Sequence, residues 1–71
     1  MLFRSLDLAV ALFAAGQQED AVGELLELYR RDRKWNDEAA RKQLLKFFEA
    51  LGPTNPLTVS GRKRLSSLMF A

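Results

Sequence analysis

Hydrophobic residues along this chain recur at helical spacing in separate stretches. The first stretch, residues 2–15, carries two apolar sides, formed by Leu2, Leu6, Ala9, Val10 and Phe13 and by Leu8, Leu12 and Ala15. The second, residues 18–33, has apolar side chains at the i, i+3, i+4 and i+7 positions Val22, Leu25, Leu26 and Tyr29. The pattern predicts helices over both stretches, with the first buried on more than one face.

Two further stretches, residues 37–51 and 56–70, show the same spacing. The apolar stripe of the third consists of Ala40, Leu44, Phe47, Phe48 and Leu51. The stripe of the fourth consists of Leu57, Gly61, Leu65, Leu68 and Met69. No alternation of useful length between apolar and polar residues appears, so the sequence predicts an all-α fold.

Residues that favour helix ends fall at or near the ends of these stretches. The candidate N-terminal caps, whose side chains can accept a hydrogen bond from a first-turn N–H, are Ser5, Asn36 or Asp37, and Asn55. Gly16 and Gly52 are placed to end the first and third helices, because glycine adopts the left-handed conformation at little cost. Gly23, inside the second helix, predicts a point where another helix approaches closely.

The length of 71 residues is that of one domain, so residues 1–71 are expected to fold as a single unit. The predicted connections are only a few residues long, and short connections place consecutive helices antiparallel. The sequence therefore predicts four antiparallel helices arranged as two stacked helical hairpins.

Several chemistries are excluded by composition. The chain has neither cysteine nor histidine, which removes disulfides, zinc knuckles, thiol nucleophiles and the commonest general base. Its carboxylates form no recognisable catalytic constellation, so we expect no enzyme activity and no cofactor. No run approaches the roughly 20 apolar residues of a membrane span, and Asp7 interrupts the apolar start that would resemble a signal peptide. We expect a cytoplasmic protein.

Charge is unevenly distributed. Residues 1–29 hold one base and five acids, whereas residues 30–71 hold ten bases and four acids. The cluster Arg30, Arg31, Arg33 and Lys34 lies beside Trp35, a combination that could bind nucleic acid by phosphate contacts and base stacking. Basic residues at a helix end also complement the helix dipole. We favour a role of this cluster in complementing the helix dipole or in binding a protein partner. A small nucleic-acid-binding domain remains the alternative.

The segment Leu8-Ala9-x-x-Leu12-x-x-x-Gly16-x-x-x-x-Ala21-x-x-x-Leu25-x-x-Leu28 resembles a tetratricopeptide repeat. In that repeat, small residues of the two helices meet, and Ala9 and Ala21 occupy those places. Leu12 departs from the usual aromatic residue, and Arg33 from the usual closing proline. The resemblance implies a pair of closely crossing helices with Gly16 at the turn.

A second resemblance covers nearly the whole chain. The runs Arg31-Asp32-Arg33-Lys34-Trp35-Asn36-Asp37-Glu38-Ala39-Ala40-Arg41-Lys42 and Leu44-Leu45-Lys46-Phe47-Phe48-Glu49-Ala50-Leu51-Gly52 are similar to the C-terminus of the bacterial thioredoxin-fold co-chaperones called YbbN, CnoX or chaperedoxin. Members of that family hold unfolding client proteins and pass them to the chaperonin GroEL, and they cooperate with the DnaK system. This chain has no Cys-x-x-Cys, so the resemblance implies a C-terminal module of a larger protein with an N-terminal thioredoxin domain.

The resemblance also implies a docking segment, since the family's last helix is implicated in binding the chaperonin. On this chain the corresponding partner-binding residues are Arg62, Lys63, Arg64, Leu65, Leu68, Met69 and Phe70. The cations would steer the helix towards acidic surface, and the apolar residues would anchor it. A further alternative is a self-association module that forms a homodimer, because a helical repeat exposes the faces that its neighbours would cover.

Overall fold

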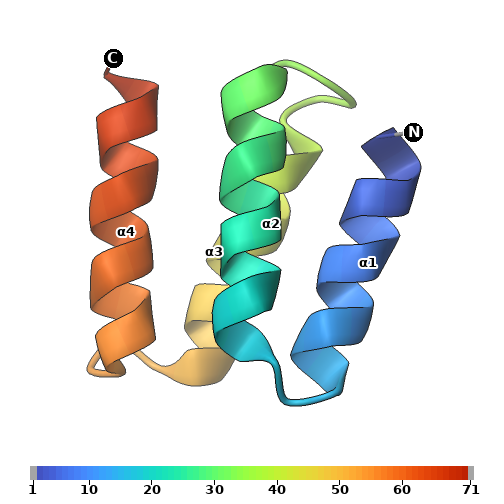
Figure 1. The fold of residues 1–71 in the computed structure, drawn as a ribbon. Helices are drawn as coiled ribbons and strands as arrows, with labels where there is room; N and C mark the ends of the chain where they lie inside the picture. The colour runs from blue at the N-terminus through green and yellow to red at the C-terminus, as the bar shows by residue number, and fades with distance from the viewer. Residues whose placement is uncertain (1, 71) are drawn as a thin grey trace.

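The computed structural model describes residues 2–70 and, within them, contains four α-helices and no strand. The helices are α1 (Leu2–Ala14), α2 (Gln18–Arg31), α3 (Ala39–Leu51) and α4 (Pro56–Met69). Consecutive helices run in opposite directions, so both ends of the described chain lie at the same end of the molecule (Figure 1). The prediction of an all-α fold made of two helical hairpins is confirmed.

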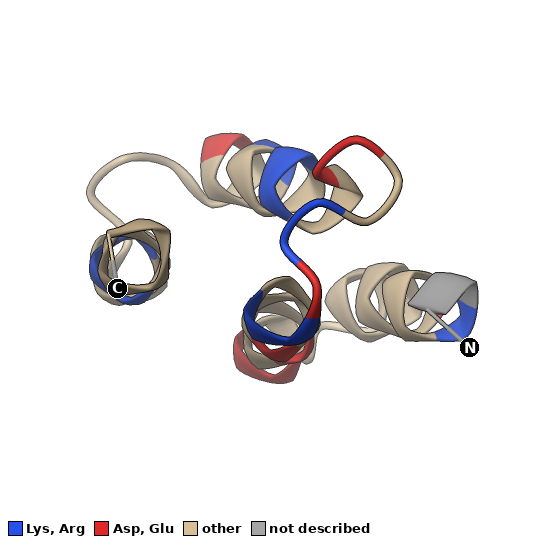
Figure 2. Ribbon diagram, turned by 90° about the horizontal axis from the view of Figure 1, so that it is seen from above, with Lys and Arg blue, Asp and Glu red and all other residues tan. Residues whose placement is uncertain are grey.

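The central helix of the fold is α2. It has α1 on one side and α4 on the other, while α3 lies behind it (Figure 1 and Figure 2). The molecule is flat, with extents of 29 × 28 × 16 Å. Because its neighbours cover it on several sides, α2 supplies half of the buried apolar core: Ala21, Val22, Leu25, Leu26, Leu28 and Tyr29.

The turn between α1 and α2 depends on Gly16, as the sequence predicts. Gly16 has a φ of +88°, and its N–H donates to the Phe13 carbonyl oxygen at 3.1 Å. The N–H of Gln17 donates to the Leu12 carbonyl oxygen at 2.9 Å. These two bonds are the Schellman arrangement, which satisfies the last carbonyls of a helix when a left-handed residue follows it.

The connection between α2 and α3 differs from the prediction. The helices were expected to cover residues 18–33 and 37–51, but α2 ends at Arg31, because Asp32 is extended (φ −152°, ψ 87°). Asn36, Asp37 and Glu38 then adopt positive φ values of 49°, 57° and 60°. This left-handed turn delays the start of α3 to Ala39.

Two predicted N-terminal caps are therefore wrong. The residue at the cap position of α3 is Glu38, which makes no capping bond with its side chain, so neither Asn36 nor Asp37 caps the helix. Ser5 lies inside α1, which begins at Leu2. The other ends differ by one residue, with α1 ending at Ala14 and α4 at Met69.

The connection between α3 and α4 follows the prediction. Gly52 adopts a φ of +95° and ends α3. The Asn55 side chain accepts a hydrogen bond from the Leu57 N–H at 2.9 Å, and Pro56 occupies the first turn, where it lacks only an N–H that the helix does not need. The cap and the proline favour the start of α4 at this point, although Thr58, Val59 and Gly61 are weak helix formers.

The close approach between helices occurs at Gly61, not at Gly23. A Cβ atom added at Gly61 would lie 2.7 Å from Cε1 of Phe48 and 3.3 Å from Cγ1 of Val22, whereas one added at Gly23 would meet nothing within 4 Å. The expectation for Gly23 is wrong because its face of α2 is not the face that another helix contacts. Gly61 is thus the residue that lets α4 approach α2 and α3.

Candidate functional site

Three consecutive cations of the predicted partner-binding set lie on the surface of α4. Arg62, Lys63 and Arg64 are all exposed, and none makes a hydrogen bond or an ion pair within residues 2–70. Consecutive residues of a helix point about 100° apart, so the three do not face one direction. Arg62 lines a depression beside α3, next to Leu45 and Glu49. Lys63 and Arg64 instead line a groove beside α2, and Arg64 also lines a second depression that includes Glu19.

The apolar members of the predicted set divide into buried and exposed residues. Leu65 is only 5% exposed and belongs to the core, so it is not available as a surface anchor. It lies one turn after Gly61 on the side of α4 that faces the other helices. Leu68 is half-buried and packs against the core, whereas Met69 is 41% exposed and Phe70 is 84% exposed. The structure therefore leaves Met69 and Phe70 as the exposed apolar pair.

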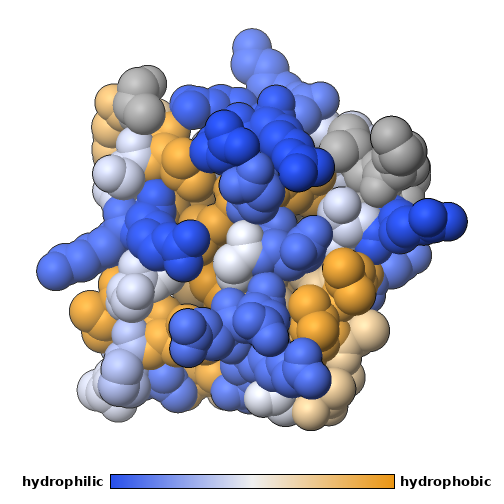
Figure 3. All heavy atoms as spheres, in the orientation of Figure 1, coloured by the Kyte–Doolittle hydropathy of each residue, from blue (hydrophilic) through white to orange (hydrophobic). Residues whose placement is uncertain are grey.

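A groove runs between α2 and α4. Its volume is about 520 Å³, and it is lined by Leu26, Glu27, Arg30, Lys63, Arg64, Ser67 and Leu68. In Figure 3, hydrophobic surface is visible between the hydrophilic residues over α4 and those over α2. The groove brings together Lys63, Arg64 and Leu68 of the predicted set with residues of α2 that the sequence analysis did not assign to a site.

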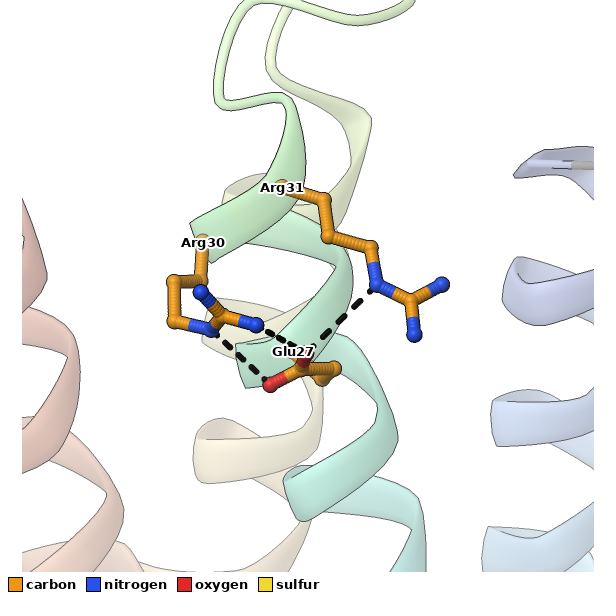
Figure 4. Close-up of polar contacts among 3 residues, drawn as sticks. All are labelled: Glu27, Arg30 and Arg31. Atoms are coloured by element: carbon orange, nitrogen blue, oxygen red, sulfur yellow. Dashed lines mark hydrogen bonds and ion pairs between the residues drawn. The ribbon is translucent and has the colours of Figure 1, made fainter.

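The α2 side of this groove carries an ion-pair network. Arg30 donates from Nε to Oε2 of Glu27 at 3.1 Å, and Nε of Arg31 lies 3.5 Å from Oε1 of the same carboxylate. Figure 4 shows Arg30 on the α4 side of Glu27 and Arg31 on the α1 side. The hydrogen bond from Arg30 lowers the pKa of Glu27 and raises the pKa of Arg30, so both groups are charged near neutral pH.

The C-terminal end of α4 is attached to the α2–α3 connection by Arg33. Its Nη2 donates to the Leu68 carbonyl oxygen at 2.6 Å, and its guanidinium lies 5.5 Å from the centre of the Tyr29 ring. Sequence reasoning assigned Arg33 to the dipole of its own helix or to nucleic acid. It missed this contact, because no local pattern pairs residues 35 positions apart.

The other members of the predicted basic cluster are also placed by the fold. Arg30 and Arg31 contact Glu27, and Trp35 is half-buried and packs against the core. Of the four cations in this cluster, Lys34 is the one with no hydrogen bond or ion pair within the described chain. The cluster is therefore not a continuous free surface of cations beside an exposed aromatic ring.

Among residues 2–70 there is no group of three carboxylate, histidine or cysteine side chains that could hold a metal ion. Over the same residues, no helix combines the length and the apolar character that crossing a membrane requires. The candidate surfaces are the groove, with its cations and apolar lining, and the end of α4, with its exposed Met69 and Phe70.

The packing of the first hairpin identifies the class of protein. Ala9 of α1 and Ala21 of α2 are both fully buried, as expected where two helices cross closely, and α3 and α4 form a second hairpin stacked on the first. This is the architecture of a helical-repeat protein. A tetratricopeptide repeat family model matches residues 4–70, and the chain belongs to that family. No curated protein and no solved structure gave a significant match.

Membership in this family defines the general role of the fold. Tetratricopeptide repeats generally mediate protein–protein interaction and are typically noncatalytic. The repeat places short helices side by side, so that their outer faces and the grooves between them form the binding surface.

Proposed function

We propose that the chain is the protein-interaction module of a thioredoxin-linked co-chaperone, which holds unfolding client proteins and passes them to GroEL and the DnaK system in the cytoplasm. Membership in the tetratricopeptide repeat family supports an interaction module. The similarity of residues 31–52 to the chaperedoxin C-terminus supports the co-chaperone role. On this proposal, the thioredoxin domain belongs to another part of the same protein.

The docking site in this proposal is the C-terminal end of α4, with Met69 and Phe70 as apolar anchors. The observation that carries it is the 84% exposure of Phe70, a large aromatic side chain, directly after a helix whose last turn is held by Arg33. Because the helix end is held, the backbone that carries this side chain needs little further ordering on binding. Arg62, Lys63 and Arg64 supply long-range attraction to acidic surface on the partner.

Binding of the labelled 71-residue domain to purified GroEL, followed by fluorescence anisotropy, tests the proposal. Phe70→Ala should weaken binding by about 1–3 kcal/mol, as is usual for an aromatic anchor. Val59→Ala is the matched control, since Val59 is an exposed apolar residue of the same helix (48%) far from its C-terminal end. A point substitution is sharper than deleting the last turns of α4, because a deletion would also remove Leu65 from the core.

The proposal requires that the wild-type domain binds saturably and that only Phe70→Ala loses affinity. Equal affinities of all three proteins would show that Phe70 is not the anchor. Absence of binding by the wild-type domain would remove the chaperonin from the proposal.

A further inference from the structure

The α2–α4 groove combines an apolar floor with a cationic rim. Half-buried Leu68 contributes most of the apolar surface, and Leu26, which is only 2% exposed, adds little to it. Arg30 lies at the α2 rim, and Lys63 and Arg64 lie at the α4 rim. The volume of about 520 Å³ falls within the range of about 300–1,000 Å³ that is usual for a site enclosing a small ligand or a few side chains.

The charges around the groove are unequal. Among the described residues that line it there are three cations and one carboxylate, Glu27, and that carboxylate already accepts hydrogen bonds from Arg30. Lys63 and Arg64 make no hydrogen bond or ion pair within the described residues. A ligand with carboxylates can therefore pair with both α4 cations without displacing an existing contact of the protein.

From this combination we propose that the groove binds a short segment of a partner protein in which an apolar side chain is flanked by carboxylates. The apolar side chain lies on Leu68, the carboxylates pair with Lys63 and Arg64, and the exposed Ser67 hydroxyl is available to the peptide backbone. This inference rests on the general role in protein interaction and specifies the chemistry of the partner. It does not depend on Phe70 or on the chaperonin.

The lining of the groove favours a peptide over nucleic acid. Single strands are bound by aromatic side chains on which the bases stack, and none of the described residues that line the groove is aromatic. The Glu27 carboxylate would repel a phosphate chain that follows the rim of α2. The half-buried Leu68, in contrast, gains from covering by an apolar side chain, because the water on its exposed part is released.

Anisotropy of a labelled peptide, with one leucine flanked by glutamates on both sides, measures this binding directly. Lys63→Ser should weaken the affinity by about three- to fivefold, as expected for one partly exposed ion pair. Lys46→Ser is the matched control, because it removes the same charge from an exposed position of α3 that does not line the groove. It should leave the affinity within about twofold of wild type, since distant exposed charges are screened by salt.

Glu27→Gln gives a test of opposite sign. It removes the one carboxylate of the rim and releases Arg30, so the affinity for the acidic peptide should rise by about two- to threefold. A substitution that merely disturbed the fold would lower the affinity instead. A peptide with glutamines in place of glutamates, and another with alanine in place of leucine, should each bind more weakly than the original.

Three results would overturn the inference: equal losses for Lys63→Ser and Lys46→Ser, weaker binding by Glu27→Gln, or tighter binding of a labelled oligothymidine than of the acidic peptide. Phe70→Ala separates this inference from the docking proposal. If the groove binds the peptide, Phe70→Ala leaves the peptide affinity unchanged, whether or not the same substitution weakens the binding of GroEL.

Discussion

Arg33 connects two parts of the chain that are distant in sequence, because its guanidinium donates a hydrogen bond of 2.6 Å to the carbonyl oxygen of Leu68. The carbonyls of the last turn of a helix have no partner within the helix, and they carry the negative end of its dipole. Arg33 supplies both a donor and a positive charge at this point. Arg33, which lies in the connection between α2 and α3, thus holds the exposed end of α4 in place.

Arg33→Gln should destabilise the domain by about 1–2 kcal/mol, since it removes a charged donor from a partly buried carbonyl. The loss should be accompanied by faster amide hydrogen exchange in the last turn of α4. Urea unfolding and hydrogen exchange measure the two effects. Lys34→Gln is the matched control, because it removes the neighbouring charge, which has no partner within residues 2–70. Equal destabilisation by both substitutions would contradict this role of Arg33.

The two helix-interior glycines should respond to alanine in opposite directions. Gly61→Ala would place a Cβ atom 2.7 Å from Cε1 and 2.9 Å from Cζ of the buried Phe48 ring, so we expect a loss of about 1–3 kcal/mol from overpacking. Gly23→Ala meets nothing within 4 Å and should stabilise the domain by about 0.5–1 kcal/mol through helix propensity alone. Urea unfolding of the two variants measures both changes, and stabilisation by Gly61→Ala would show that the helices do not approach closely at this point.

The features that sequence predicted correctly are those determined by neighbouring residues. Apolar spacing predicted all four helices, and local backbone chemistry predicted the turn at Gly16 and the start of α4 at Asn55 and Pro56. Each of these depends on side chains a few positions apart. Such patterns are visible in the sequence without knowledge of the tertiary structure.

The features that sequence reasoning missed depend on which helix faces which. Periodicity does not indicate that Gly61 and not Gly23 faces another helix, and it does not pair Arg33 with the end of α4. The turn at Asn36, Asp37 and Glu38 is a similar case, because three consecutive non-glycine residues at positive φ are locally unfavourable. Trp35, directly before this turn, packs against the core, so the turn is part of the tertiary packing and not of a local pattern.

The candidate site was predicted only in part, because it too depends on which helix faces which. The sequence identifies Arg62, Lys63 and Arg64 as a charged run, but only the fold separates Arg62 from the other two. Leu65 and Phe70 are both apolar residues near the chain end, yet Leu65 lies in the core and Phe70 at the surface. Glu27 and Arg30 join the groove through packing between α2 and α4, which no local pattern indicates.

The two hairpins are joined by an aromatic stack between α1 and α3. The rings of Phe13 and Phe47 have centroids 4.2 Å apart and are inclined by 13°. A double-mutant cycle with Phe13→Leu and Phe47→Leu should give a coupling free energy of about 0.5–1.5 kcal/mol, because leucine keeps most of the apolar area but loses the ring–ring contact. Additive losses in urea unfolding would show that the two rings do not stabilise each other.

The ion pair between Asp37 and Lys42 should make stability depend on acid pH. Nζ of Lys42 lies 2.6 Å from Oδ2 of Asp37, and this hydrogen bond lowers the pKa of Asp37 from its ordinary 3.8. A carboxyl with a lowered folded-state pKa stabilises the fold above its unfolded pKa, and the contribution disappears as the pH falls through the folded value. Because the pair is exposed, the effect should be small.

Asp37→Asn should therefore flatten the fall in urea stability that the wild type shows below about pH 5. Asp7→Asn removes an exposed carboxylate that has no partner within the described residues, and it serves as the control. If both variants have the slope of the wild type, the ion pair with Lys42 does not contribute to folding in solution.

Thr58 is a buried polar residue whose hydroxyl adds no hydrogen bond to the fold of residues 2–70. The residue is 1% exposed, and Oγ1 has no hydrogen-bond partner among the described residues. A buried hydroxyl without a partner loses its hydrogen bonds to water and gains none in return. Thr58→Val keeps the branched shape and removes the hydroxyl, so it should stabilise the domain by about 1 kcal/mol.

Thr58→Ser makes the complementary change, because it keeps the hydroxyl and removes the methyl group. It should destabilise the domain by about 1 kcal/mol, the usual cost of losing one buried methyl group. Urea unfolding of the two variants decides which half of the side chain matters. If Thr58→Val destabilises as much as Thr58→Ser, the hydroxyl has a partner in solution, and this stretch of α4 owes part of its stability to that bond.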